Sequence, residues 1–332
     1  MTHKIVLKKQ IEDAQFPTRL EHYTELDKRN ALSTDHKNEF ARLKSGFEGE
    51  QTILDYIEEY GEPHWKVFQN IWLNYYGKFE VDCMLVTHDQ IYLFEIKHYT
   101  GHYIFQNSQC SCNGQKIGHN AINQAQKSHI NFQNFLRQNQ FNASVIGALI
   151  FTGIDCEISV HDDVDDLQIV TRNQLRNFIW QIRHTERNNS RSPIDTDHLI
   201  QIIDSYEINS PFLPEPISDE THSLLQKGIQ CSQCHSFEID TSKLYISCKC
   251  GMSEPRENAI VRTICEYGVI HFNKDLAITD ILDFFNRDYS RGTIVKYLNK
   301  YFTQISTGRH IKYANTIRFG NLDFKLSRYY SC

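Results

Sequence analysis

The sequence predicts an α/β protein in which a mixed sheet flanked by helices is followed by a small zinc-binding module and a helical, winged-helix-like domain. Three observations predict this fold class. Strand-like runs and helical periods alternate over residues 39–209, four cysteines lie within twenty residues, and helical periods return after Pro255. The strand-like runs at the centre of the first region follow one another closely, which favours an antiparallel meander.

Length and charge limit the classes of protein to consider. The chain has 332 residues, 40% of them hydrophobic and 23% charged, which is typical of a globular protein with more than one core. Its longest apolar run, 145–151, is far shorter than the roughly 20 residues that span a membrane, so no membrane span is expected. Residues 1–10 lack the apolar stretch of a secretion signal, and we expect a cytoplasmic protein. The net charge of −6 means that any contact with nucleic acid is local.

The domain boundaries follow from changes in pattern along the chain. Residues 1–38 are polar and without a persistent period, so we interpret them as an N-terminal arm. From Glu39 to Tyr60 apolar residues recur at helical spacing, with a break expected near Gly46 and Gly49. Three of the seven prolines lie in a short stretch that indicates a stiff linker. The expected parts are the arm (1–38), an α/β domain (39–209), the linker (210–218), a zinc-binding knuckle (219–255) and a winged-helix-like domain (256–332).

The α/β domain is expected to contain three consecutive strands. They cover residues 65–73, 79–87 and 90–98, and the short junction between the last two is typical of a hairpin. A helix over 120–138 then leads to a buried strand at 145–151.

Two acids and a lysine on neighbouring strands form the first candidate site. Side chains alternate between the two faces of a strand, so Glu95 and Lys97 share a face. A hairpin register places Asp82 beside Glu95, with Lys97 adjacent. Phosphodiester hydrolysis uses such a cluster, because carboxylates hold Mg²⁺ or Mn²⁺ and a lysine orients or deprotonates the attacking water. The alternative is a surface hairpin with a cross-strand ion pair.

The segment from about Glu39 to Phe151 resembles the nuclease-related domain of bacterial proteins, a member of the PD-(D/E)XK nuclease superfamily. The matching residues are Gly46-Phe47-Glu48-Gly49-Glu50, Glu80-Val81-Asp82, Phe94-Glu95-Ile96-Lys97-His98-Tyr99-Thr100-Gly101 and Asn120-Ala121-Ile122-Asn123-Gln124. The resemblance covers about a third of the chain and implies a restriction-endonuclease-like fold.

The resemblance also implies a role for each matching residue. Asp82 and Glu95 would be ligands of Mg²⁺ or Mn²⁺, and Lys97 would orient or deprotonate the water. Glu50 would be a supporting helix carboxylate and Gln124 a polar helper; the alternatives are a helix-surface carboxylate and a helix-start residue. The chain departs from the family pattern at Ala121, where proline is usual, and at His98, where asparagine is frequent. The first departure affects the start of a helix more than the chemistry.

Four cysteines form the second candidate site. Cys231 and Cys234 are followed, after thirteen residues, by Cys248 and Cys250. Two such pairs in a short segment predict a tetrahedral Zn²⁺ site, and four protein ligands leave no open position for catalysis. The second pair is unusually close in sequence, so His235 remains a substitute ligand, and free thiols or a redox pair are the alternative.

The region after Pro255 predicts three helices followed by a short hairpin, the order of a winged helix. Residues 287–318 hold seven Arg or Lys and one acid, Asp288, which gives +6. The candidate nucleic-acid contacts are Arg291, Lys296 and Lys300 on the recognition helix, and Arg309 and Lys312 on the wing. The alternative is a helical protein-interaction domain with solvated lysines.

Together these features favour a Mg²⁺-dependent endonuclease acting on DNA, with C-terminal modules that hold the nucleic acid. The competing hypothesis is a non-catalytic protein that uses the nuclease-like domain as a scaffold. Its C-terminal modules would then bind DNA or dock onto another DNA-processing protein.

Overall fold

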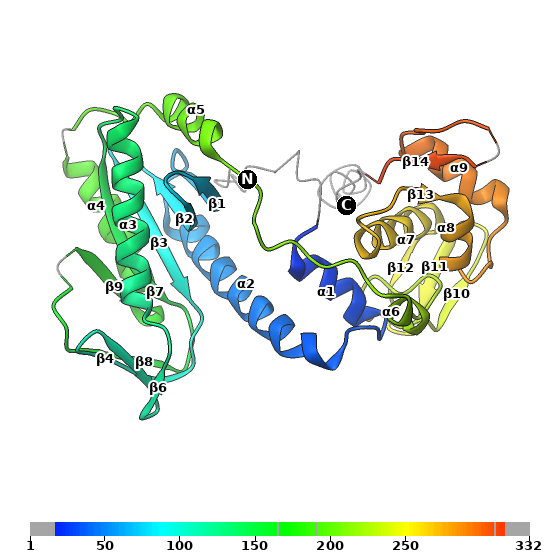
Figure 1. Cartoon of the computed structure of the whole chain (residues 1–332), viewed down its shortest axis with the longest axis horizontal. Helices are drawn as coiled ribbons and strands as arrows, with labels where there is room; N and C mark the ends of the chain where they lie inside the picture. The colour runs from blue at the N-terminus through cyan, green and yellow to red at the C-terminus, as the bar shows by residue number, and fades with distance from the viewer. Residues whose placement is uncertain (1–16, 165, 190, 309, 316–332) are drawn as a thin grey trace. The chain divides into compact units, whose positions relative to one another are not determined.

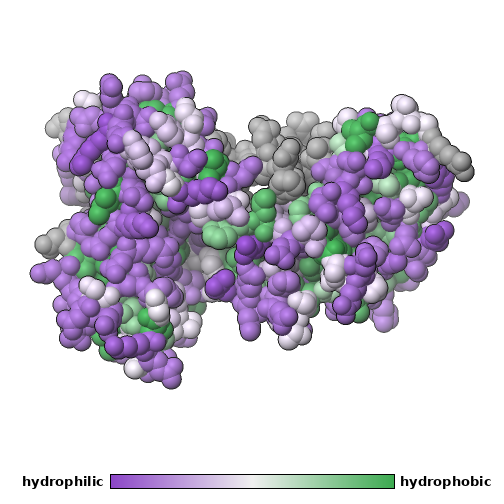
Figure 2. Space-filling model, in the orientation of Figure 1, coloured by the Kyte–Doolittle hydropathy of each residue, from purple (hydrophilic) through white to green (hydrophobic). Residues whose placement is uncertain are grey.

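The computed structural model describes residues 17–315 except 165, 190 and 309, and divides into two units (Figure 1). Unit 1 comprises Arg42–Ser210, and unit 2 comprises the described residues before 42 together with those from Pro211 onward. Figure 2 shows that hydrophilic side chains dominate the visible face of both units, with apolar side chains scattered among them. Within the described ranges, no helix is both long and apolar enough to cross a bilayer.

Unit 1 is built on a mixed five-stranded sheet in the order β1-β2-β3-β7-β9. The first three strands form an antiparallel meander, and β3, β7 and β9 run parallel to one another. The strands are β1 (Lys66–Asn74), β2 (Lys78–Val86), β3 (Gln90–Lys97), β7 (Ser144–Phe151) and β9 (Leu167–Thr171). The predicted α/β class with a mixed sheet is therefore confirmed.

Helices cover both faces of this sheet. The helices are α2 (Thr34–Tyr60), α3 (Ala121–Gln138), α4 (Leu175–Asn188), which follows the short helix η1 (Arg172–Gln174), and α5 (Thr196–Tyr206). Apolar residues of α2 and α4 form one core with the sheet, and those of α3 and α5 form a second core. This arrangement buries strands on both faces, which explains the nearly continuous apolar run at 145–151.

A second, four-stranded sheet in unit 1 follows directly after β3. Its order is β6-β5-β4-β8. The strands are β4 (Gly101–Gln106), β5 (Gln109–Cys112), β6 (Gln115–Ile117) and β8 (Cys156–Val160). A third apolar cluster links it to the start of α3 through Phe105, Ile122 and Phe151.

Helix α2 is continuous through both glycines at which a break was expected. Nothing lies within 4 Å of a Cβ built on Gly46, but one on Gly49 would lie 2.9 Å from the Cβ of His98 and 2.9 Å from Oγ1 of Thr152. The lack of a side chain at Gly49 therefore lets α2 pack closely against the end of β3. The pattern that suggested a break marks a close helix–strand contact instead.

Unit 2 combines a small ribbon with a helical domain. Its elements are α1 (Arg19–Lys28), α6 (Asp219–Leu224), β10 (Ile239–Thr241), β11 (Tyr245–Cys248), β12 (Ser253–Pro255), α7 (Arg256–Ile270), β13 (Leu276–Ala277), α8 (Ile278–Phe284), α9 (Arg291–Tyr301) and β14 (Lys312–Tyr313). Strands β10, β11 and β12 form an antiparallel sheet, and β13 pairs with β14. Backbone hydrogen bonds also join Ile305 to Lys312 and Ala314 to Thr303, so a short hairpin follows α9 as in a winged helix.

Helix α1 lies within residues 1–38, the segment interpreted as an N-terminal arm. It begins with a capping box between Thr18 and Glu21 and packs against α7. Arg29, fully buried, donates to Glu266 at 2.6 Å and lies over the ring of Phe284. The buried residues of this segment include His22, Glu25 and Arg29 beside apolar residues, which weakens the hydrophobic period of the sequence.

Candidate nuclease site

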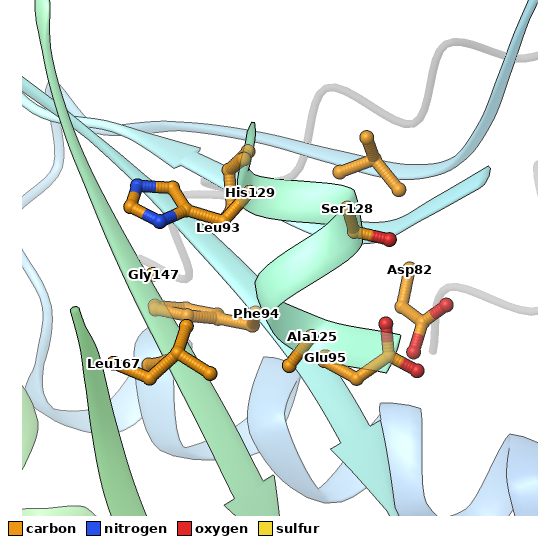
Figure 3. A pocket seen from close by; sticks show the side chains of 11 residues that line it. Asp82, Leu93, Phe94, Glu95, Ala125, Ser128, His129, Gly147 and Leu167 are labelled. Atoms are coloured by element: carbon orange, nitrogen blue, oxygen red, sulfur yellow. The ribbon is translucent and has the colours of Figure 1, made fainter. Parts of the chain in front are cut away.

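The β2–β3 hairpin brings the two predicted acids together. The register pairs Cys83 with Phe94, which sets Asp82 opposite Glu95. The backbone N–H of Ile96 donates to Oδ2 of Asp82 at 3.0 Å, and Nζ of Lys97 donates to Oε1 of Glu95 at 2.6 Å. Figure 3 shows the carboxyl groups of Asp82 and Glu95 directed toward each other. Asp82, Glu95 and Lys97 thus meet at one place, and the acids are not scattered over separate surfaces.

The strand geometry around Asp82 is less regular than simple alternation predicts. Val81 packs into the core with α3 and α5, while Cys83 packs into the core with α2 and α4. Regular alternation along β2 would place both side chains on one face, so the alternation is interrupted between them. On β1, Gln69 and Ile71 are paired but Asn70 between them is not, and Asn70 has a φ of +52°. This local distortion lies beside Asp82 and interrupts the alternation of side chains.

Glu50 reaches the same region from α2. Nδ2 of Asn70 donates to its Oε2 at 3.1 Å, so the distorted residue of β1 also holds the helix carboxylate. Burial, partly offset by Asn70, and the charge of Asp82 raise the pKa of Glu50 to about 7. Glu50, the predicted supporting carboxylate, therefore lies close to Asp82. No hydrogen bond joins Glu50 to Asp82 or Glu95 in the described structure.

Glu80 is a fourth carboxylate that the sequence analysis did not include in the site. Burial and the charges of Asp82, Glu50 and Glu95 raise its pKa to about 8. Its position two residues before Asp82 is the signal that could have identified it. The cluster of Glu50, Glu80, Asp82, Glu95 and Lys97, here called the acidic cluster, contains four carboxyl groups and one amino group.

Burial dominates the electrostatics of the acidic cluster. It raises the pKa of Asp82 despite Lys97 and the N–H of Ile96, and burial together with Asp82 raises the pKa of Glu95 to about 7. Burial alone would lower the pKa of Lys97, but Glu95 and Asp82 raise it. Lys97 is therefore an ammonium group at neutral pH, and the crowded carboxylates retain protons unless a cation compensates them.

A small cavity lies between this hairpin and α3 (Figure 3). It is lined by Asp82 and Glu95 at one end and by Ala125, Ser128 and His129 of α3. Its volume is about 10 Å³, close to the lower limit for one water molecule.

Gln124 and His98 contribute less directly than the acids. Gln124 lies in the first turn of α3 with an exposed side chain, which makes no hydrogen bond to the acidic cluster in the described structure. The side chain of Asn120 caps this helix by accepting the N–H groups of Ile122 and Asn123, so α3 begins normally at Ala121 without proline. Nδ1 of His98 is 2.9 Å from Oγ1 of Thr152, a contact at the end of β3.

The four cysteines of unit 2 form a second polar cluster. The Sγ atoms of Cys231, Cys234, Cys248 and Cys250 all lie within 4.8 Å of one another, with closest pairs at 3.5 and 3.6 Å. Tetrahedral Zn²⁺ with Zn–S bonds of about 2.3 Å requires S–S separations of about 3.8 Å, so the thiols can hold such a metal. Burial would raise the pKa of Cys231, but backbone N–H groups of Cys234 and Gln233 lower it to about 7, which favours a thiolate. His235 is not part of the cluster.

The predicted basic contacts in α9 and after it are partly neutralised. Lys300 pairs with Glu257 at 2.6 Å and Lys312 with Asp275 at 3.7 Å, while Nζ of Lys296 lies 5.1 Å from the ring centre of Tyr297. Arg291 is exposed at the start of α9. Arg309 lies outside the described residues. Tyr297 and Tyr313 are buried in the core of this part of the chain.

Unit 1 is thus an α/β domain whose mixed sheet is covered by helices on both faces and carries acids and a lysine on adjacent strands. Residues 45–152, about a third of the chain, match the family model described as the nuclease-related domain. All five residues of the acidic cluster lie inside the match, whereas the four cysteines and helices α7, α8 and α9 lie outside it. No curated protein and no solved structure matches the chain.

Proposed function

We propose that this protein is a divalent-cation-dependent endonuclease that hydrolyses phosphodiester bonds in DNA. The observation that carries the proposal is the juxtaposition of Asp82, Glu95 and Lys97 inside the nuclease-related domain. Buried acids with raised pKa values and a charge partner are typical of functional sites.

The donor set fits Mg²⁺ or Mn²⁺. Asp82 and Glu95 supply carboxylate oxygens, the ligands that these hard cations prefer, and a divalent ion would offset their crowding with Glu50 and Glu80. When bound, the ion would polarise the phosphoryl oxygen and stabilise charge on the leaving group.

In this proposal Lys97 acts as a positively charged ammonium group and not as a general base. Its ammonium group is held at Glu95, where it is placed to orient the attacking water or a phosphate oxygen by donating hydrogen bonds. Glu50 and Asn70 support the site from the helix side, and Gln124 is assigned to contact the substrate from the exposed start of α3.

The four cysteines are proposed to hold a structural Zn²⁺. Four thiolates would fill the tetrahedral coordination of the metal and leave no position for a substrate or water. The metal would therefore stabilise the β10–β12 ribbon rather than catalyse a reaction. Clustered free thiols also favour a reducing location such as the cytoplasm.

The winged helix is proposed to assist in holding DNA through Arg291, Lys296, Lys300, Arg309 and Lys312. A specific observation favours a second candidate for this part alone, docking onto a DNA-processing protein. Lys300 and Lys312 already have acidic partners, and a phosphate must compete with them. If the lysines contact DNA, Lys296→Gln weakens the binding of a labelled duplex. It also reduces the slope of log K against log salt concentration by the amount that corresponds to one phosphate contact. Unchanged binding would favour docking.

Plasmid cleavage tests the enzymatic proposal. The intact protein is expected to nick or linearise plasmid DNA with Mg²⁺ or Mn²⁺ and to be inactive in EDTA, while Asp82→Asn and Lys97→Gln lose at least about a hundredfold in rate. Asp240→Asn, an exposed acid of the ribbon, serves as the matched control and retains activity. Equal cleavage by all four proteins would reveal a contaminant, and no cleavage by any would refute the proposal.

A further inference from the structure

Unit 2 contains a cavity of about 390 Å³ that belongs to neither the acidic cluster nor the four-cysteine cluster. It is lined by the loop before the cysteines, by β10, by the first residue of α7 and by the turn between α8 and α9. The lining residues are Lys227, Gly228, Ile229, Phe237, Ile239, Thr241, Arg256, Asn286, Asp288 and Tyr289. The volume lies in the range of roughly 300–1,000 Å³ that is typical of small-molecule sites.

The walls of this cavity combine aromatic surface with a few polar groups. Phe237 and Tyr289 supply rings, and Ile229 and Ile239 add apolar surface. The guanidinium of Arg256 lies 4.9 Å from the ring centre of Tyr289. Flat apolar surfaces flanked by donors and acceptors are typical of sites for a planar, hydrogen-bonding ligand.

Arg256 supplies a guanidinium group to the wall of the cavity. A guanidinium group carries a permanent positive charge and several N–H donors, which suit the oxygen atoms of a phosphate. Lys227 adds a second ammonium group at the cavity, where Asp283 holds it at 2.7 Å. Both side chains of this pair are partly exposed, so an incoming anion can reach Lys227.

The turn between α8 and α9 presents a further unusual feature. Asn286 and Arg287 both have positive φ values, 54° and 61°, although neither is glycine. Such a conformation is uncommon for arginine, and strained backbone of this kind persists where the surrounding structure holds it. Asn286 and Asp288, on either side of Arg287, line the cavity.

We infer that this cavity binds a single nucleotide of a nucleic-acid strand, with the base between Phe237 and Tyr289 and the phosphate at Arg256 and Lys227. Asp288 then accepts hydrogen bonds from an amino group on the base edge. The assignment rests on the proposed function, since a nuclease domain in the same chain makes a nucleic acid the expected partner of unit 2. A ligand that contacts the cations, the aromatic rings and the Asp288 carboxylate together must have an anionic group, a flat ring and a hydrogen-bond donor.

The nucleotide site predicts a preference among bases. Cytosine, adenine and guanine carry an exocyclic amino group for the Asp288 carboxylate, whereas thymine does not. Asp288→Asn replaces an acceptor-only group by one that also donates, so the preference against thymine should decrease.

Titration calorimetry with the full chain tests the inference, using 5′-dCMP and 5′-dTMP. The intact site is expected to bind dCMP more tightly than dTMP. Arg256→Gln is expected to weaken dCMP binding roughly tenfold, the loss of a charge-assisted hydrogen bond. Lys274→Gln, which removes an exposed cation of unit 2 outside the cavity, should change it less than about threefold.

Circular dichroism and zinc content of each variant establish that unit 2 is intact. If Arg256→Gln perturbs folding, Phe237→Leu and Asp288→Asn provide independent tests of the ring and the acid. No nucleotide binding, or equal binding by Arg256→Gln and Lys274→Gln, would overturn the inference, and so would binding that is lost in Arg291→Gln but kept in Arg256→Gln. Plasmid cleavage with these variants separates the two proposals: persistent cleavage without nucleotide binding removes only the site, and nucleotide binding without any cleavage removes only the enzyme.

Discussion

Replacing Glu80 by glutamine is expected to stabilise the metal-free protein at alkaline pH. The pKa of Glu80 is raised from 4.5 to about 8 by burial and by its acidic neighbours. A carboxyl whose pKa is higher in the folded state has no effect on stability below about pH 4.5. As pH rises from about 4.5 to about 8, the carboxyl ionises in the unfolded chain but not in the folded one, so the free energy of unfolding decreases. Above about pH 8 this loss of stability is constant.

The size of this effect follows from the shift. A change of 3.5 pKa units corresponds to at most about 4.8 kcal/mol. Glu80 is partly accessible and its ionisation is linked to that of Asp82, Glu50 and Glu95, so we expect about 2–3 kcal/mol at pH 8.5 and almost none at pH 4.5.

Urea denaturation in EDTA at these two pH values measures the effect. The matched control is Glu48→Gln, an exposed glutamate on α2, for which the free energy of unfolding should change by less than about 0.5 kcal/mol. The reasoning is refuted if Glu80→Gln stabilises the protein equally at both pH values, or no more than Glu48→Gln does at pH 8.5.

Three further predictions concern other parts of the chain. Gly49→Ala places a Cβ 2.9 Å from His98 and Thr152, so overpacking should destabilise unit 1 by about 1–3 kcal/mol in urea denaturation, whereas Gly46→Ala, with open space around it, should be neutral or stabilising. The protein is expected to contain one equivalent of zinc, and chelation or Cys234→Ser should lower both this zinc content and the melting temperature of unit 2. A metal-free protein of unchanged stability would contradict a structural zinc site. The pKa of His271 is lowered from 6.5 to about 3 by burial and by His222, so its stabilising contribution is complete above pH 6.5 and is lost as pH falls toward 3. His271→Phe should reduce the decrease in melting temperature that occurs as the pH falls from 6.5. An unchanged dependence of the melting temperature on pH would show that the imidazole is not held neutral.

The sequence by itself determined the local features of both sites. The alternation of strand residues and a short hairpin suffice to set Asp82 opposite Glu95 with Lys97 adjacent, because register follows from neighbouring residues. The spacing of the four cysteines likewise predicted the cluster, since two closely spaced pairs need only one hairpin to meet. The mixed sheet was predictable for the same reason, as its strands and helices have distinct periods.

The tertiary structure decided which distant groups join these local features. Glu50 becomes a member of the acidic cluster because α2 packs closely against the end of β3 at Gly49 and because Asn70 of β1 donates a hydrogen bond to its carboxylate. The partners of Lys300 and Lys312 are acids from other elements of unit 2, so the free charge of the winged helix could not be counted from composition. Helix α1 is stabilised by buried polar contacts such as Arg29 with Glu266, which weaken the hydrophobic period. Burial and long-range charge depend on the packing of segments far apart in sequence, and these interactions set the pKa values and complete the sites.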